Sequence, residues 1–150
     1  MRKIIAFLFL VIVIFSACEK DDFCTQNPVT PKLILRFYDD ANRDNTKSAN
    51  ALYVWSGTKD SIFENISTDS LVIPLNSNTN QTIYNLSKGN VVEQFTIDYT
   101  IGNEYVSRSC GFKVIFNDLT FSPDNTWITG FTQIETTIDN QNEAHVQIFH

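Results

Sequence analysis

Three cysteines and two histidines are the residues of this 150-residue chain best suited to do chemistry. His145 and His150 are five positions apart in a stretch that predicts a strand, so they would point to opposite faces. The sequence contains no glycine-rich phosphate loop, no Gly-x-Ser-x-Gly elbow and no His-Glu-x-x-His helix. We therefore expect a protein that is not an enzyme, with no cofactor and no metal site. The strand that ends at His150 is expected at the edge of a sheet.

The first cysteine, Cys18, follows an N-terminal segment with three parts. Residues 2 and 3 are basic, residues 4–15 are apolar without interruption, and residues 16 and 17 are small. This layout is typical of a secretory signal peptide. As a helix the apolar run would be about 18 Å long, whereas a bilayer core is about 30 Å thick. The segment 1–17 is therefore predicted to be a signal peptide, with a transmembrane helix as the weaker alternative.

The run Ser16-Ala17-Cys18 resembles the bacterial lipobox. In that motif the cysteine sulfur receives diacylglycerol before cleavage, and the freed amine is then acylated. The resemblance implies that Cys18 is the lipidated first residue of the mature protein and that its acyl chains anchor the protein in a membrane. Phe15 departs from the pattern, which prefers leucine at this position.

Two further features resemble signals of Bacteroidetes proteins. Lys20, Asp21 and Asp22 are similar to the surface-export signal of lipoproteins in that group. This implies a location on the outer membrane facing the cell exterior, and the alternative is a charged tether on the periplasmic face. The triplets that contain Ser61 and Ser70 resemble an O-glycosylation sequon, in which Asp-Ser precedes an apolar residue.

The remaining cysteines, Cys24 and Cys110, are expected to form a disulfide, because two cysteines outside the cytoplasm usually pair. The bond would close a loop of 85 residues and stabilise the fold by about 4–5 kcal/mol in the chain-entropy model. A metal pair or a reactive thiol is the alternative, although the histidines lack the short spacing of zinc ligands. The tether from Cys18 to Cys24 spans at most about 20 Å, which predicts that the end of the domain near Cys110 faces the membrane.

The charge of the chain excludes one class of partner. Cleavage after residue 17 would remove two of the 11 basic residues, leaving nine against 17 acidic residues and a net charge of −8. Such a chain is repelled by the phosphates of DNA and RNA, and the sequence has no basic stripe. We expect no nucleic-acid binding.

One loop carries alternating oxygen ligands of the kind found in calcium sites. Asp40, Asn42 and Asp44 match the first part of such a loop. The sixth position is Asn45 instead of glycine, and the twelfth is Ala51 instead of glutamate. A solvated acidic turn is the better interpretation.

Three aromatic residues, Tyr53, Trp55 and Trp127, have the flat apolar faces that stack on sugar rings. Aromatic residues in strands more often fill the core. Alternation places Tyr53 and Trp55 on the face opposite Leu52 and Val54, so one of these two pairs is expected to face solvent. These aromatics form the candidate ligand face.

The mature chain reads as short strands separated by turns. Alternating apolar residues predict strands over 32–38, 52–55, 61–66, 70–75, 82–86, 126–138 and 144–149, the 126–138 segment being broken near Gly130. Pro74 suggests an edge for its strand. We expect an all-β chain with a tether over 18–31 and one antiparallel β-sandwich, immunoglobulin-like or similar, over 32–150. A small β-barrel is the alternative.

The clearest pattern in the mature chain predicts a hairpin. Apolar residues alternate over 91–101, and Gly102-Asn103 suits a tight two-residue turn. The returning strand over 105–116 also alternates, with Arg108 as the discordant member of its apolar face.

Beyond the lipobox, the chain resembles a family of small uncharacterised flavobacterial lipoproteins. The resemblance is carried by residues 18–22, 31–39, 106–117 and 145–150, and it implies no activity. Two functions remain. One is a surface-exposed, non-catalytic module that binds glycan or protein, and the other is a structural or assembly subunit of an outer-membrane complex.

Overall fold

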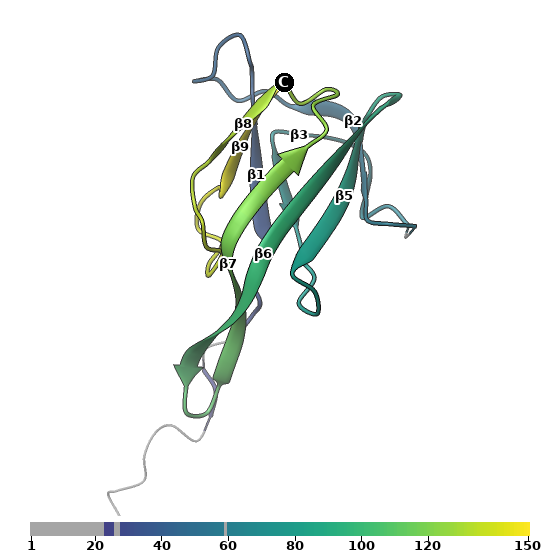
Figure 1. Cartoon of the computed structure of the whole chain (residues 1–150). Coiled ribbons are helices and arrows are strands. Elements are labelled where there is room, and N and C mark those ends of the chain that lie inside the picture. The colour runs from purple at the N-terminus through teal and green to yellow at the C-terminus, as the bar shows by residue number, and fades with distance from the viewer. Residues whose placement is uncertain (1–22, 26–27, 59) are drawn as a thin grey trace, which may run out of the picture. The chain divides into compact units, whose positions relative to one another are not determined.

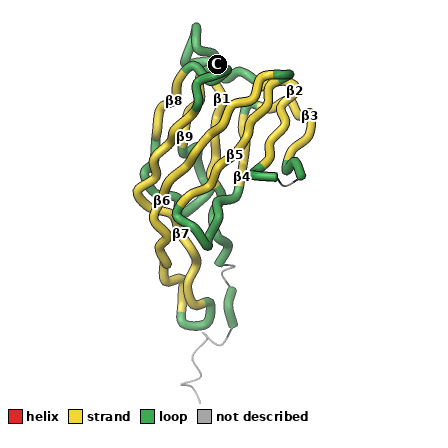
Figure 2. Tube along the Cα trace, turned by 45° about the vertical axis from the view of Figure 1, so that its right-hand side comes forward, coloured by secondary structure: helices red, strands yellow, loops and turns green. Residues whose placement is uncertain are grey.

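A computed structural model of the protein describes residues 23–25, 28–58 and 60–150. All regular elements in this part are strands, so it includes no helix able to span a membrane (Figure 2). The contacts divide the chain into two units. The small unit contains residues 105–112 and the described residues up to 28, and the large unit contains residues 29–104 and 113–150.

The strands form two sheets (Figure 1). The four-stranded sheet has the order β4 (Ser70–Ile73), β1 (Leu33–Tyr38), β9 (Val146–Phe149) and β8 (Gly130–Gln133). The five-stranded sheet has the order β3 (Phe63–Thr68), β2 (Ala49–Trp55), β5 (Gln81–Lys88), β6 (Val91–Ser107) and β7 (Gly111–Pro123). The predicted β-sandwich is confirmed, and the sheets do not close into a barrel.

Alternation along the strands builds the core of the large unit. Leu33, Leu35 and Phe37 of β1 are fully buried, and the residues between them are partly exposed. Phe95 and Ile97 of β6 are buried in the same way. Burying each such side chain stabilises the fold by about 1.5–3 kcal/mol. The pattern in the sequence therefore decides which face of each strand enters the core.

The loop after β4 is held by tyrosine hydroxyls. Tyr84 donates a hydrogen bond to the carbonyl of Pro74 at 2.5 Å, and Tyr99 donates one to the carbonyl of Asn76 at 2.7 Å. Burial, with a smaller contribution from Tyr99, raises the pKa of Tyr84 to about 12.

The strand before Pro74, β4, lies at the edge of its sheet as predicted.

The position predicted for the strand that ends near His150 is wrong. β9 is an interior strand, which pairs with β1 on one side and β8 on the other. Its pairing with β1 is parallel, so the four-stranded sheet is mixed and not purely antiparallel. A short apolar strand has the same pattern in either direction, and only its distant partner decides the difference.

The predicted turn at Gly102-Asn103 is also wrong, because β6 continues to Ser107 and the chain turns at residues 108–110. A Cβ atom on Gly102 would lie 2.6 Å from Asn117 Nδ2 and 3.1 Å from Ile115 Cγ1, both on β7. Gly102 thus makes room for side chains of the neighbouring strand. The predicted strand 126–138 shortens to β8, with one isolated bridge between Phe116 and Ile138.

Candidate binding face

The outer surface of β2 presents two aromatic side chains. Leu52 and Val54 are fully buried, whereas Tyr53 is 38% exposed and Trp55 is half-buried. In the register with β5, Tyr53 lies opposite Ser87 and Trp55 lies opposite Asn85. The structure therefore decides which of the two alternating pairs faces solvent, and it is the aromatic pair.

These aromatic residues line a depression on that face. It has a volume of about 630 Å³ and is lined by Tyr53, Trp55, Asp60, Ser61, Glu64, Ser87 and Gly89. Two ring systems thus lie near two carboxylates and two serine hydroxyls. The Ser87 hydroxyl donates to the carbonyl of Gly89 at 2.9 Å, so its oxygen remains available as an acceptor. The site can offer apolar surface and hydrogen-bond acceptors together.

Irregular pairing of β2 with the edge strand β3 shapes this face. The register shifts between Ala49 and Leu52 and again between Leu52 and Val54. Ala51 and Asn65 have φ angles of 51° and 50°, a conformation uncommon for residues other than glycine. Such bulges re-aim side chains and occur often at sheet edges and beside binding sites.

Trp127 does not belong to this face. Its indole N–H donates to the carbonyl of Leu86 at 2.8 Å, and its ring centroid lies 6.0 Å from that of Phe37 in the core. The Lys88 ammonium lies 5.3 Å from the centroid of the indole. The grouping of Trp127 with Tyr53 and Trp55 is therefore corrected, because Trp127 packs against the core.

A buried carboxylate, Glu93, positions the segment that carries Trp127. Its side chain is fully buried and accepts backbone hydrogen bonds from Asn125 at 2.8 Å and Thr126 at 2.7 Å. The Thr126 hydroxyl and the N–H groups of Trp127 and Ile128 donate to it as well, at 2.8, 3.3 and 3.4 Å. Sequence reasoning missed this role, although a signal was present. Glu93 lies two residues before Phe95 and so on the same face of the strand, where the alternation predicts an apolar residue.

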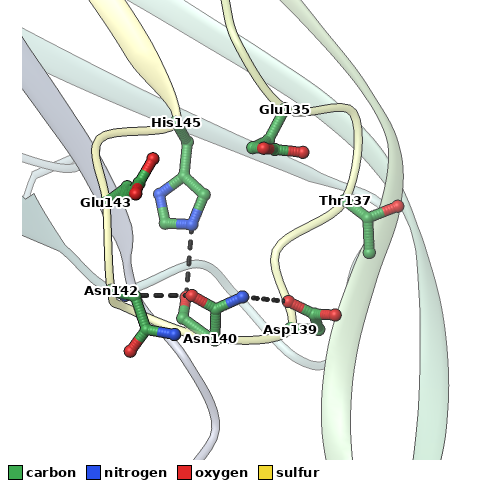
Figure 3. Close-up of a pocket in the computed structure, with 7 residues that line it drawn as sticks. All are labelled: Glu135, Thr137, Asp139, Asn140, Asn142, Glu143 and His145. Atoms are coloured by element: carbon green, nitrogen blue, oxygen red, sulfur yellow. Dashed lines mark hydrogen bonds between the residues drawn. The ribbon is translucent and has the colours of Figure 1, made fainter.

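A second hollow surrounds His145 (Figure 3). Its volume is about 290 Å³, and it is lined by Glu135, Thr137, Asp139, Asn140, Asn142, Glu143 and His145. His145 Nδ1 accepts from the N–H of Ile34 at 3.0 Å, so Nε2 carries the proton and donates to the carbonyl of Asn140 at 3.2 Å. Both ring nitrogens are therefore engaged in holding the loop before β9. Within the described residues, no three histidine, cysteine or acidic side chains are grouped to hold a metal.

His150 is similarly engaged. Its Nδ1 lies 2.7 Å from Lys88 Nζ, and its Nε2 lies 3.2 Å from the carbonyl of Lys47. Burial is the main cause that lowers the pKa of both His145 and His150. The two histidines serve structural hydrogen bonds.

The acidic loop after β1 uses its carboxylates in ion pairs. Asp39 pairs with Lys47 at 2.8 Å, and Asp40 pairs with Arg43 at 2.7 Å. The hydrogen bond from each cation is the main cause that lowers the pKa of its aspartate partner. Of the three residues that match a calcium loop, Asp40 thus has a carboxylate oxygen engaged in an ion pair within the chain.

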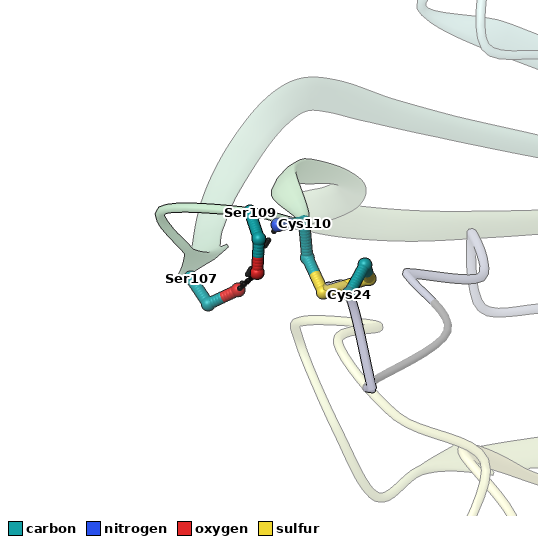
Figure 4. The surroundings of a disulfide bond; sticks show 4 residues. All are labelled: Cys24, Ser107, Ser109 and Cys110. Carbon is teal, nitrogen blue, oxygen red and sulfur yellow. Dashed lines mark hydrogen bonds between the residues drawn. A yellow bond between two sulfur atoms is a disulfide. The ribbon is translucent and has the colours of Figure 1, made fainter. Parts of the chain in front are cut away.

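The structure joins Cys24 and Cys110 in the predicted disulfide, within the small unit (Figure 4). Their Cα atoms are 4.8 Å apart. The N–H of Cys110 donates to Ser107 Oγ at 3.0 Å, which braces the turn at residues 108–110. Gly111 follows with a φ of 73°, a left-handed conformation that glycine adopts at little cost.

The remaining predicted positions divide into two groups. Ser61 and Ser70 are both partly exposed, and Ser70 lies in β4 with its N–H donating to Thr68 Oγ1 at 3.1 Å. Their glycosylation stays a prediction. Cys18 and the export residues Lys20, Asp21 and Asp22 lie outside the described residues.

The fold and the candidate face define a β-sandwich protein with a solvent-facing aromatic depression. Residues 51–150 match the model of a family of unknown function, DUF6452, and the chain belongs to that family. The match begins within β2 and includes Tyr53, Trp55 and Cys110. No curated protein and no solved structure matches the chain.

Proposed function

We propose that this protein is a lipid-anchored lipoprotein of the outer membrane, displayed on the cell surface, and that it binds a glycan without catalysing a reaction. The observation that carries the glycan-binding part is the solvent-facing pair Tyr53 and Trp55 beside the carboxylates of Asp60 and Glu64. Aromatic faces stack on the C–H faces of sugars, and carboxylates accept hydrogen bonds from sugar hydroxyls. The anchor is supported by the signal-like segment and by the Ser-Ala-Cys sequence that ends at Cys18.

The charges of the face favour one class of glycan. Asp60 and Glu64 line the depression, and none of the described residues that line it is a lysine, arginine or histidine. Uronic-acid and sulfated sugars would be repelled, since like charges at short range disfavour binding. The preferred ligand is therefore a neutral or amino-sugar glycan.

A glycan array probed with the detergent-solubilised full-length protein tests this function. Trp55→Ala should weaken binding by about 2 kcal/mol, roughly thirtyfold in Kd, as for an aromatic residue at the centre of a binding site. Tyr53→Ala should also weaken it, whereas Tyr105→Ala is the matched control, because Tyr105 is an exposed tyrosine outside the face. An array on which the wild-type protein binds no glycan refutes the proposal.

The location has separate tests. Cys18→Ser should abolish acylation, detected by mass spectrometry, and release the protein from membranes. Proteinase added to intact cells should remove the wild-type protein, and complete protection would contradict surface display. A silent array combined with recovery of the protein in a membrane complex would instead favour the accessory-subunit function.

A further inference from the structure

The small unit exposes three large aromatic side chains. Phe23 is 81% exposed, Tyr105 58% and Phe112 65%. All three lie in the two short segments that the Cys24–Cys110 disulfide joins. Exposed apolar side chains that gather on one surface can form a contact site for a protein, a ligand or a membrane.

A disulfide and a hydrogen bond hold the backbone around these rings, and two of the rings contact each other. The disulfide ties Phe23 to the turn through its neighbour Cys24, and Ser107 accepts a hydrogen bond from the N–H of Cys110. The rings of Tyr105 and Phe112 are packed edge to face, with centroids 5.4 Å apart. The rings of Tyr105 and Phe112 are therefore exposed on a turn that is itself held in place.

The charge of the turn differs from that of the whole chain. Residues 105–112 contain one arginine, Arg108, and no acidic residue, although the chain has a net charge of −6. Aromatic rings on a turn without acidic side chains suit the interface of a bilayer, where tyrosine is enriched and anionic headgroups repel carboxylates.

The short distance along the chain between Cys18 and Cys24 also points to a membrane as the contact of these rings. Cys24 follows Cys18 by six positions, and that length of chain spans at most about 20 Å at 3.3–3.6 Å per residue. An acylated Cys18 would therefore confine Cys24, and through the disulfide Cys110, to the neighbourhood of the headgroups.

We propose that the small unit inserts Phe23, Tyr105 and Phe112 into the headgroup region of the bilayer that holds the acyl chains of Cys18. The protein then has a second, aromatic contact with the membrane beside its covalent anchor. This inference rests on the lipid anchoring in the proposed function and is independent of glycan binding.

Bromolipid quenching of tryptophan fluorescence tests the insertion. The full-length acylated protein is placed in vesicles of phosphatidylethanolamine and phosphatidylglycerol with brominated acyl chains. Phe112→Trp should show quenching and a shift of emission to shorter wavelength, beyond the signal of wild-type Trp55 and Trp127. Phe131→Trp is the matched control, because Phe131 is an exposed phenylalanine of the large unit, and it should add no quenching.

The outcomes separate the anchor from the inserted rings. Acylation detected by mass spectrometry and flotation with the vesicles, without extra quenching at position 112, would overturn the insertion and leave the anchor standing. Protein that neither carries acyl chains nor floats would overturn both. Shielding of position 112 from aqueous acrylamide without bromolipid quenching would also overturn the insertion, since a protein partner or a second copy would then cover the rings. Because Phe112 is exposed, its replacement is expected to preserve the fold, which an unfolding curve verifies.

Discussion

The molecule contains two aromatic groups with similar ring geometry and opposite surroundings. In the small unit, Tyr105 and Phe112 meet edge to face, and both are more than half exposed. In the large unit, Trp127 meets His150 edge to face at 5.5 Å and lies 6.0 Å from the fully buried Phe37. An edge-to-face contact therefore occurs both on the surface and against the core, and only the burial of the rings distinguishes the two groups. Replacing each group should reveal the difference.

The largest effect is expected from Phe37→Ala. Removing this fully buried ring leaves a cavity beside Trp127 and should lower the free energy of unfolding by about 3–5 kcal/mol. Phe112→Ala, at the other group, should change it by no more than about 0.5 kcal/mol. Urea denaturation of both variants measures the contrast, and equal losses would contradict it.

A smaller loss is expected from Glu93→Gln, which tests what holds Trp127 in the buried group. In the wild-type protein both carboxylate oxygens of Glu93 accept hydrogen bonds from backbone N–H groups. Glutamine keeps one acceptor oxygen and places an NH₂ group, which cannot accept, against the other N–H donors. Losing hydrogen bonds to a charged group should cost about 2–3 kcal/mol. Glu64→Gln is the control on the exposed face, and its stability should stay near that of wild type. A stable Glu93→Gln variant with unchanged tryptophan fluorescence would show that the carboxylate does not position Trp127.

The mildest effect is expected from pH, which acts on the histidines of the large unit. Burial lowers the folded-state pKa of His145 and His150 below the ordinary value of 6.5. Between that value and the folded-state pKa, the unfolded chain binds more protons, so stability falls as the pH drops below 6.5. The charges near the rings are Glu135 and Asp139 at His145, and Lys88, Lys47 and Asp39 at His150.

Urea midpoints between pH 7.5 and 5 measure this loss. His145→Asn keeps an acceptor for the N–H of Ile34 and removes one titrating ring, so its midpoint should depend less on pH. An unchanged slope would contradict the assignment. The ion-paired Asp39 and Asp40 lose their stabilising charge only at pH values below their ordinary pKa of 3.8, outside this window.

The parts of the fold that follow from local alternation were predictable. The inward residues of β1 and the outward direction of Tyr53 depend on the two-residue period of a strand. The disulfide followed from the number and context of the cysteines. In each case neighbouring residues or composition carried the information.

The predictions that failed depended on distant residues. Gly102 resembles a turn residue, yet its role is to admit side chains of β7. Trp127 has no local mark of burial, because its place is set by Glu93, Leu86 and Phe37. Glycan binding and insertion into the bilayer rest on the exposed rings and remain proposals.

The parallel pairing of β1 with β9 has a consequence for folding. The hydrogen bond from the N–H of Ile34 to His145 closes a separation of 111 residues, and folding slows as contacts become more distant along the chain. Among the described strands, β8 pairs only with β9, and β9 joins β8 to β1, so β8 cannot join this sheet before residues 146–149 are available. A partly synthesised chain would contain only the β1–β4 pair of this sheet. The four-stranded sheet is therefore completed only when the last strand of the chain has been synthesised.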